Sequence, residues 1–308
     1  MLDLLPPCAT TGVGSLPFGH PADAVAHVID AYDVPFCPQL PLLEGDMVAE
    51  WLGADPCCCG WSPERDRERP RAWEAFLDAV SARPPEHGVV KLQVTGPLTL
   101  ATALGDTALA GELAAWMAAS AAEQVGVLRE HDLNPLLVVD EPSLETAAPS
   151  PAEAAATWDA LRAVAPAWGL HVCCRVPWDV VERADPDLLS FDLAGTGRLD
   201  RHASRTLERM LRRRTRVAWG ICPVGTADEV GPAARWMAEA MEVLGSRGIG
   251  RDTLLSRSLL TPSCGTALAE PARERRLAEV VDAVAGAGRG LVARSARERI
   301  EAVGPARR

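Results

Sequence analysis

A histidine and a cysteine two positions apart, His171 and Cys173, are the residues of this chain best suited to metal chemistry. They lie in the apolar run Leu170-His171-Val172-Cys173-Cys174, which is typical of a short buried strand. Because side chains alternate between the two faces of a strand, we expect His171 and Cys173 to point the same way. An imidazole nitrogen and a thiolate sulfur on one face favour zinc among the common biological metals.

Two ligands do not complete a metal site, and Cys264 is the candidate for a third. It lies in Thr261-Pro262-Ser263-Cys264-Gly265, just after another apolar run, and its small, turn-forming neighbours are typical of a strand end. A packed core histidine beside an inert cysteine would also explain His171 and Cys173. The adjacent cysteines Cys57, Cys58 and Cys59 lack the spacing of a C-x-x-C ligand pair, so we interpret them as part of a loop without metal.

The elements that position these residues alternate between apolar runs and amphipathic segments. The apolar runs predict eight strands, over residues 9–14, 34–40, 89–94, 136–139, 171–174, 188–191, 217–221 and 254–260. Helices are expected over residues 21–31, 71–81, 107–131, 151–168, 177–184, 199–214, 226–245, 270–285 and 293–303. Strands separated mostly by helices favour parallel crossovers, and eight such units predict an α/β fold, a single (β/α)8 TIM barrel. We expect one domain over residues 1–308, with a Cys-rich insertion at 53–70 after the second strand.

In such a barrel the polar residues that follow each strand meet at one rim, where the active sites of this fold lie. The residues that end or follow the expected strands are Ser15, Glu44, Thr95, Asp140, Glu141, His171, Cys173, Asp192, Cys222 and Cys264. Strand ends are also places where polar residues are tolerated, and this explains any one of these positions. A histidine, several cysteines and several carboxylates at one rim are better explained by a metal site.

Composition narrows the classes of partner. The chain of 308 residues is 48% hydrophobic and carries a formal net charge of −11. Such an acidic chain argues against nucleic acid or an anionic membrane as a partner. No apolar run approaches the roughly 20 residues needed to span a bilayer, and the N-terminus lacks the basic region of a secretory signal. We therefore expect a cytoplasmic protein whose cysteines are reduced.

Six short motifs occur along the chain in a fixed order. They are Gly12-Val-Gly-Ser-Leu-Pro17, Leu43-Glu-Gly-Asp-Met-Val48, Thr95-Gly-Pro97, Val139-Asp-Glu-Pro142, His171-Val-Cys173 and Pro262-Ser-Cys-Gly265. Together they resemble the catalytic barrel of cobalamin-independent methionine synthase, within the larger group that includes uroporphyrinogen decarboxylase and corrinoid-linked methyltransferases. The resemblance is to a short form without the second, N-terminal barrel of the long enzymes, and it implies the barrel fold independently of the strand count.

The resemblance implies that His171, Cys173 and Cys264 bind zinc. Asp192 stands where the family has a glutamate as the fourth ligand, and is one methylene shorter. A free thiol has a pKa of about 8.5, and coordination to zinc deprotonates it. A labile carboxylate ligand yields its position to the incoming thiol. The implied activity is methylation of a small thiol, homocysteine first, which gives methionine.

The resemblance also implies roles in substrate binding. Glu44 and Asp140 resemble catalytic-site carboxylates that hold the substrate amino group, with Glu141 beside them. Ser15 and the neighbouring backbone resemble the site that binds the substrate carboxylate. The residue types leave simpler explanations open, because Asp140 also suits a strand end and Ser15 also suits a helix cap.

Two departures from the family bear on the methyl donor. The family has an Asp and a His after the seventh strand, whereas this chain reads Trp219-Gly-Ile-Cys-Pro-Val-Gly-Thr226, and its one lysine, Lys91, offers little to the polyglutamate tail of a folate. We therefore expect a methyl-corrinoid, free or on a corrinoid protein, rather than methyl-folate. Two alternatives stay open: a non-catalytic zinc or corrinoid carrier, and a metal-free decarboxylase of porphyrin acids that would use Arg175 and Arg198.

Overall fold

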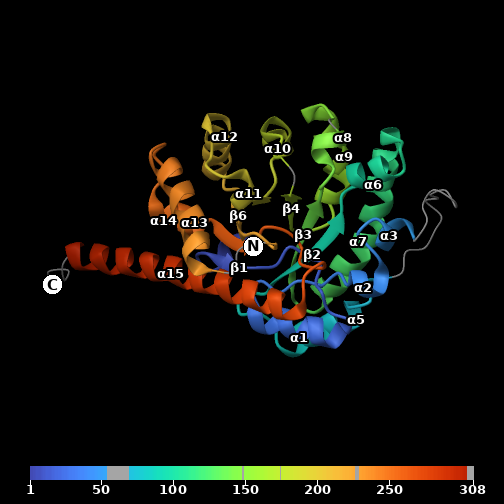
Figure 1. Ribbon diagram of the computed structural model, residues 1–308, viewed down its shortest axis with the longest axis horizontal. Coiled ribbons are helices and arrows are strands. Elements are labelled where there is room, and N and C mark those ends of the chain that lie inside the picture. The colour runs from blue at the N-terminus through green and yellow to red at the C-terminus, as the bar shows by residue number, and fades with distance from the viewer. Residues whose placement is uncertain (54–68, 148, 174, 226–228, 304–308) are drawn as a thin grey trace.

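The computed structural model describes residues 1–53, 69–147, 149–173, 175–225 and 229–303. In this part of the chain the strands form one curled, all-parallel sheet in the order β1-β7-β6-β5-β4-β3-β2. The strands are β1 Ala9–Thr10, β2 Val89–Thr95, β3 Asn134–Asp140, β4 Ala167–Val172, β5 Leu188–Asp192, β6 Arg216–Cys222 and β7 Ser258–Pro262. Figure 1 shows the helices arranged around the outside of this sheet. The predicted α/β fold with parallel crossovers is confirmed.

Helices fill the connections between the strands. They are α1 Pro21–Ala31, α2 Pro41–Glu44, α3 Ala49–Leu52, α5 Trp73–Ala82, α6 Pro97–Ala103, α7 Ala110–Glu130, α8 Leu144–Ala147, α9 Pro151–Arg162, α10 Trp178–Ala184, α11 Leu193–Thr196, α12 Arg201–Arg212, α13 Val230–Gly245, α14 Arg251–Ser256 and α15 Pro271–Val303, with 3-10 turns η1 Leu2–Leu4 and η2 Thr107–Leu109. Among these described helices, none combines the length and the apolar character needed to cross a bilayer.

Local chemistry explains where several of these elements begin. Ser150 and Glu153 form a capping box at the start of α9, and the Asp200 carboxylate accepts from the Ala203 N–H at the start of α12. Residues with positive φ stand just before four strands, where the chain turns back towards the sheet. These residues are Gly88, Asp132, Asp185 and Arg214.

The strand predicted over residues 34–40 is not a regular strand. Two isolated parallel bridges join the segment to its neighbours, Phe36 to Lys91 of β2 and Gln39 to Ser15. Pro35 and Pro38 supply no backbone N–H, so the segment lacks two of the donors that a continuous ladder requires. The sheet therefore has seven assigned strands and this irregular segment between its edges, and the closed eight-stranded barrel is not confirmed.

The sequence prediction is also wrong at several boundaries. The strands expected over residues 9–14 and 171–174 are β1 Ala9–Thr10 and β4 Ala167–Val172, so Cys173 lies just outside its strand. The helix expected over residues 151–168 ends at Arg162, because Pro166 interrupts it and Trp168 already belongs to β4. The strand expected over residues 254–260 begins only at Ser258, since its first residues form the end of α14. A short apolar run does not by itself distinguish a buried helical turn from a buried strand.

The two helices expected at residues 270–285 and 293–303 form one helix, α15. Figure 1 shows α15 running along one side of the molecule and projecting beyond the other helices at its C-terminal end. Gly288 lies in the middle of α15, and a Cβ there would stand 2.7 Å from the Cys8 sulfur. The glycine therefore allows the helix to approach Cys8 closely, at the usual cost in helix propensity.

A small apolar cluster fills the inside of the sheet towards the N-terminal ends of the strands. Its buried members are Leu5, Ala9, Val34, Val89, Leu136, Val138, Ala167, Leu188, Ala218 and Leu259. A larger cluster packs the outer face of the sheet against the helices. The polar residues at the C-terminal strand ends thus stand above a largely apolar interior.

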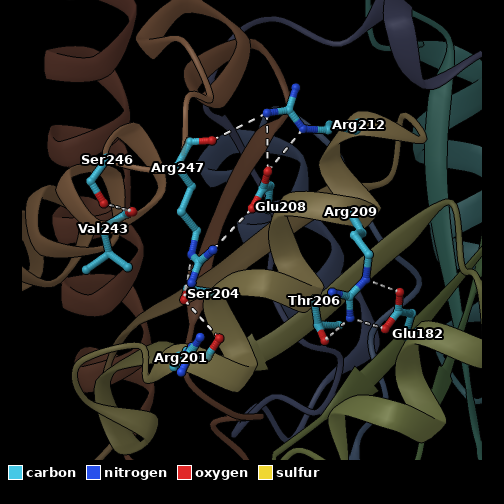
Figure 2. A network of polar contacts seen from close by, with 10 residues as sticks. All are labelled: Glu182, Arg201, Ser204, Thr206, Glu208, Arg209, Arg212, Val243, Ser246 and Arg247. Atoms are coloured by element: carbon cyan, nitrogen blue, oxygen red, sulfur yellow. Dashed lines mark hydrogen bonds and ion pairs between the residues drawn. The ribbon is translucent and has the colours of Figure 1, made fainter.

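On the outer surface a polar network links α10, α12 and the C-terminal end of α13 (Figure 2). Arg209 of α12 donates to both carboxylate oxygens of Glu182 in α10, and Arg247 donates to Ser204 and Glu208 of α12. These groups are partly exposed, so each pair adds little free energy of folding. Their effect is to align three neighbouring helices on this side of the sheet.

Candidate metal centre

His171, Cys173 and Cys264 come together at the C-terminal end of the sheet, as the sequence predicts. Each offers one ligand atom, and these atoms all lie within 4.8 Å of one another. His171 is buried in β4, Cys173 follows the last residue of that strand, and Cys264 is exposed two positions after β7. The C-terminal end of β4 therefore supplies a nitrogen and a sulfur, and the loop after β7 brings the second sulfur to them.

A neighbouring strand orients the His171 ring. Oγ of Ser190 in β5 lies 2.8 Å from Nδ1 of His171, and the two residues are register partners across the β4–β5 pair. Nε2 of His171 is buried and has no well-aligned hydrogen-bond partner among the described residues. Because Nδ1 is engaged by Ser190, Nε2 is the nitrogen left to act as a ligand.

The electrostatics of the triad favour a thiolate. Hydrogen bonds with Cys173 and His171 lower the pKa of Cys264 from 9.0 to about 4, against the opposing effect of partial desolvation of its sulfur. Thiolate is the form of cysteine that binds metals. The two sulfurs and the ring nitrogen also match the ligand types of zinc sites with an open position.

The spacing of the triad fits a zinc ion. In tetrahedral geometry, zinc–sulfur and zinc–nitrogen bonds place ligand atoms about 3.5–3.8 Å apart, so the triad needs a contraction of roughly 1 Å at most. Nε2 of His171 is the second observation in favour, because it is buried and has no well-aligned hydrogen-bond partner among the described residues. His171, Cys173 and Cys264 therefore fit the group that the sequence motifs imply.

Asp140 ends β3 beside the triad. It is 4% exposed, and its Oδ1 has no hydrogen-bond partner among the described residues. Burial raises the pKa of Asp140 from 3.8 to about 6, while the charges of His171 and Lys91 act in the opposite direction. A carboxylate with a free oxygen in this position is suited to accept a hydrogen bond from a bound ligand.

Glu141 and Glu44, by contrast, are occupied by the protein itself. Glu141 is fully buried and accepts from the N–H groups of Leu98 and Thr99, the Thr99 hydroxyl and the Trp158 indole. Burial raises its pKa to about 7 despite these bonds. Both carboxylate oxygens of Glu44 also accept backbone N–H groups, from Leu40 and Arg71. Each carboxylate thus has an evident role in holding a loop.

Ser15 lies against the loop that carries Cys264. Its carbonyl accepts from the Thr266 N–H at 2.8 Å, and a Cβ on Gly265 would overlap its hydroxyl. Only glycine at position 265 leaves room for the Ser15 hydroxyl next to Cys264. The structure therefore brings Ser15 to the triad.

Asp192 stands at the end of β5, and its Oδ1 accepts from the Gly195 N–H at 2.7 Å at the start of α11. It is not one of the three residues with ligand atoms within 4.8 Å of one another. Asp192 and Cys173 both line one groove of about 1040 Å³. Arg175 and Arg198 line the same groove.

The sequence did not reveal the roles of several residues near the triad. Ser190 reads as an ordinary core position, and only its register with His171 reveals its role. Lys91 is 2% exposed inside the sheet, although a charged residue within the apolar run of β2 was a visible signal.

Cys222, expected at the rim, is 1% exposed and not part of the triad, and burial raises its pKa to about 12. Cys57, Cys58 and Cys59, with most of the expected insertion at 53–70, lie outside the described residues.

No protein-family model and no curated protein matches the sequence. Among solved structures, the chain is similar to a B12-independent methionine synthase from Shewanella sp. W3-18-1, solved in complex with selenomethionine. The TM-score is 0.63 at 13% identity, over 93% of this chain and 99% of that chain. The two proteins share a fold. The identity is too low to carry more than the fold, so the activity rests on the residues of this chain.

Proposed function

We propose that this protein is a zinc-dependent methyltransferase that methylates a small thiol, with homocysteine as the first candidate and methionine as the product. The observation that carries the proposal is the meeting of His171, Cys173 and Cys264 at the C-terminal end of the sheet. The motifs of the sequence and the shared fold with a methionine synthase support it. We also infer that residues 34–40 complete an eight-membered barrel, and that residues 1–308 act as one domain.

In this proposal His171, Cys173 and Cys264 hold the zinc, and Asp192 is a labile fourth ligand. A zinc ion held there would supply the Lewis acidity that keeps a bound thiol deprotonated at neutral pH. Two thiolates and a neutral imidazole balance the charge of the ion. The substrate sulfur would then be electron-rich enough to accept a methyl group from the donor. Ser190 keeps the His171 ring in the orientation that presents Nε2.

The amino-acid half of the substrate would bind beside the triad. The unpartnered Oδ1 of Asp140 is suited to the substrate ammonium group, and Ser15 with its backbone to the carboxylate. Selenomethionine in the related fold is an amino acid of the same size and charge as the proposed product. Glu44 and Glu141 would support these groups through the loops they hold rather than by direct contact.

The methyl donor would enter through the groove that Cys173 and Asp192 line. We favour a methyl-corrinoid, free or on a corrinoid protein, over methyl-folate. Lys91 is buried inside the sheet and cannot reach the tail of a folate. A groove of about 1040 Å³ that opens to solvent suits a large donor whose bulk remains outside the protein.

The proposal is tested with protein loaded to one zinc per chain and given L-homocysteine. Methionine formation is measured with methylcobalamin and, in parallel, with methyltetrahydrofolate. X-ray absorption at the zinc edge should show one additional sulfur neighbour after homocysteine is added. No methionine from either donor, together with an unchanged spectrum, would contradict the proposal. An added sulfur without methionine from either donor would favour a non-catalytic carrier.

The metal-free alternative makes a different prediction. A decarboxylase of porphyrin acids would use Arg175 and Arg198 of the groove and would not need the triad. Loss of decarboxylation in an R198Q variant, with activity unaffected by a chelator, would support that function instead.

Asp192→Ala separates two roles of the Asp192 carboxylate. If Asp192 is a labile zinc ligand, the substitution changes the zinc spectrum of the protein without substrate. If Asp192 is only a helix cap, the substitution lowers stability and leaves that spectrum unchanged.

A further inference from the structure

Three alternate residues of β2 use their side chains to bond to the chain between β1 and β2. Lys91 donates to the carbonyl of Val13, Gln93 donates to that of Cys37, and Thr95 donates to that of Met47. Residues two apart on a strand share a face, so these groups form a row along the inner face of β2. The row acts where the irregular segment after β1 offers few ladder hydrogen bonds.

Lys91 is the most costly member of this row. It is the one lysine of the chain and is 2% exposed, with Nζ 2.5 Å from the Val13 carbonyl and 5.0 Å from the centre of the Phe36 ring. Burial lowers its pKa from 10.5 to about 8, so the side chain is still a cation at neutral pH. A buried cation in an apolar strand is expensive unless its partners require it.

One of these partners, Val13, belongs to the loop that reaches the metal triad. A Cβ on Gly12 would overlap the Phe36 ring, and one on Gly14 would stand 2.7 Å from Gln93, so the loop lies flat on these side chains. Val13 is tied to Lys91 between the two glycines. Ser15 follows Gly14, and its carbonyl accepts a hydrogen bond from the Thr266 N–H beside Cys264.

We infer that Lys91 is a positioning residue whose buried ammonium group tethers Val13 and so holds residues 12–15 as a rigid platform for the substrate carboxylate beside Cys264. The carboxylate role rests on the proposed function, whereas the tether does not. The hydrogen bond of Lys91 keeps the backbone of the loop in place to receive the carboxylate, and the charge of Lys91 interacts with Asp140.

The tether is tested without any substrate, by hydrogen exchange of backbone amides. The reporters are the amides of Leu16, Gln39 and Thr266, which bond to Gln39, Gly14 and Ser15 respectively. In K91M these amides should exchange about tenfold faster than in the wild type, because one buried charged hydrogen bond is lost. K91Q, whose side chain carries no charge and is one bond shorter than that of lysine, serves if K91M does not fold.

The matched control is R216M. Arg216 is also a buried cation on a strand, 4% exposed, but its guanidinium bonds to Ser256 at the opposite end of the sheet. Its loss should leave the three reporter amides unchanged. Equal exchange in K91M and the wild type, or an equal rise in R216M, would overturn the tether.

The effect on ligands is measured with zinc-loaded protein by calorimetry, with L-homocysteine and with 3-aminopropane-1-thiol, which lacks only the carboxylate. We expect the preference of the wild type for L-homocysteine to fall about tenfold in K91M and K91Q, and to stay unchanged in R216M. Affinity for the amine, and zinc content, should change little. Equal loss of both ligands would overturn the positioning role. If the wild type binds neither thiol, the proposed function fails, and the exchange result still decides the tether.

Discussion

Oγ of Ser190 lies 2.8 Å from Nδ1 of His171, across two neighbouring strands of the sheet. This contact decides which ring nitrogen faces the two cysteines. A residue behind a metal ligand that sets its orientation contributes to metal affinity without touching the metal.

Ser190→Ala should weaken zinc binding about 10- to 100-fold and leave the stoichiometry at saturating zinc unchanged. The ring of His171 would lose the partner that orients it. The measurement is competition with a chelator of known affinity. Ser258→Ala is the control, because Ser258 is also buried but accepts from the Trp219 indole instead. An equal loss of zinc affinity in both variants would show that the effect comes from general loosening of the sheet.

Cys264→Ala should lose most bound zinc, since it removes one of three ligand atoms. Cys222→Ala should keep its zinc, because the Cys222 thiol is buried outside the triad. Metal analysis of the two purified variants checks this difference. If the two lose zinc to the same extent, the assignment of Cys264 as a ligand is wrong.

Gly96→Ala should destabilise the fold by about 3 kcal/mol. A Cβ at position 96 would overlap the Glu141 carboxyl group, which would have to leave the four donors that surround it. Gly126→Ala is the opposite case: nothing lies within 4 Å of its Cβ position in the middle of α7, and the change should stabilise the fold by about 1 kcal/mol. Urea unfolding of the two variants should therefore shift in opposite directions.

Stability should depend on pH through Lys91. Its pKa falls from 10.5 in the unfolded chain to about 8 in the fold, so the unfolded chain holds the proton more tightly between these values. The buried charge of Lys91 lowers the stability of the fold at neutral pH, and this stability is regained as the pH rises from about 8 towards 10.5. From pH 7 to pH 9 the wild type should gain about 1 kcal/mol relative to Lys91→Met. Parallel curves for the two proteins in urea titrations would contradict the shifted pKa.

Much of the architecture was predictable because it depends on local periodicity. The apolar runs at residues 89–94, 136–139, 188–191 and 217–221 are all strands, and their parallel order follows from the helices between them. The run at 254–260 was predicted to be a strand throughout, but Leu254 and Leu255 are buried on a helical turn. Burial alone does not set the backbone conformation. At 34–40 the prolines were the signal against a regular strand.

The candidate site was predictable only in part. The carboxylates of Glu141 and Glu44 stand at the expected strand ends, yet the protein's own N–H groups occupy them. Asp140 ends β3 one residue before Glu141 and keeps an unpartnered oxygen. Residue type alone does not tell an occupied carboxylate from an available one. The N–H donors that occupy Glu44 and Glu141 come from other segments of the chain.

The amino-acid sequence alone paired His171 with Cys173, because residues two apart in an extended backbone point to the same side. The structure ends β4 at Val172, one residue before Cys173. The sequence also determined the parallel α/β class, through the order of its apolar and amphipathic segments. Only the tertiary structure decided that Cys264 joins them while Cys222 is buried elsewhere. It alone decided that Lys91 is tied to the loop of Ser15. Such contacts join residues far apart in the chain, and they exist only once the strands have taken their places in the sheet.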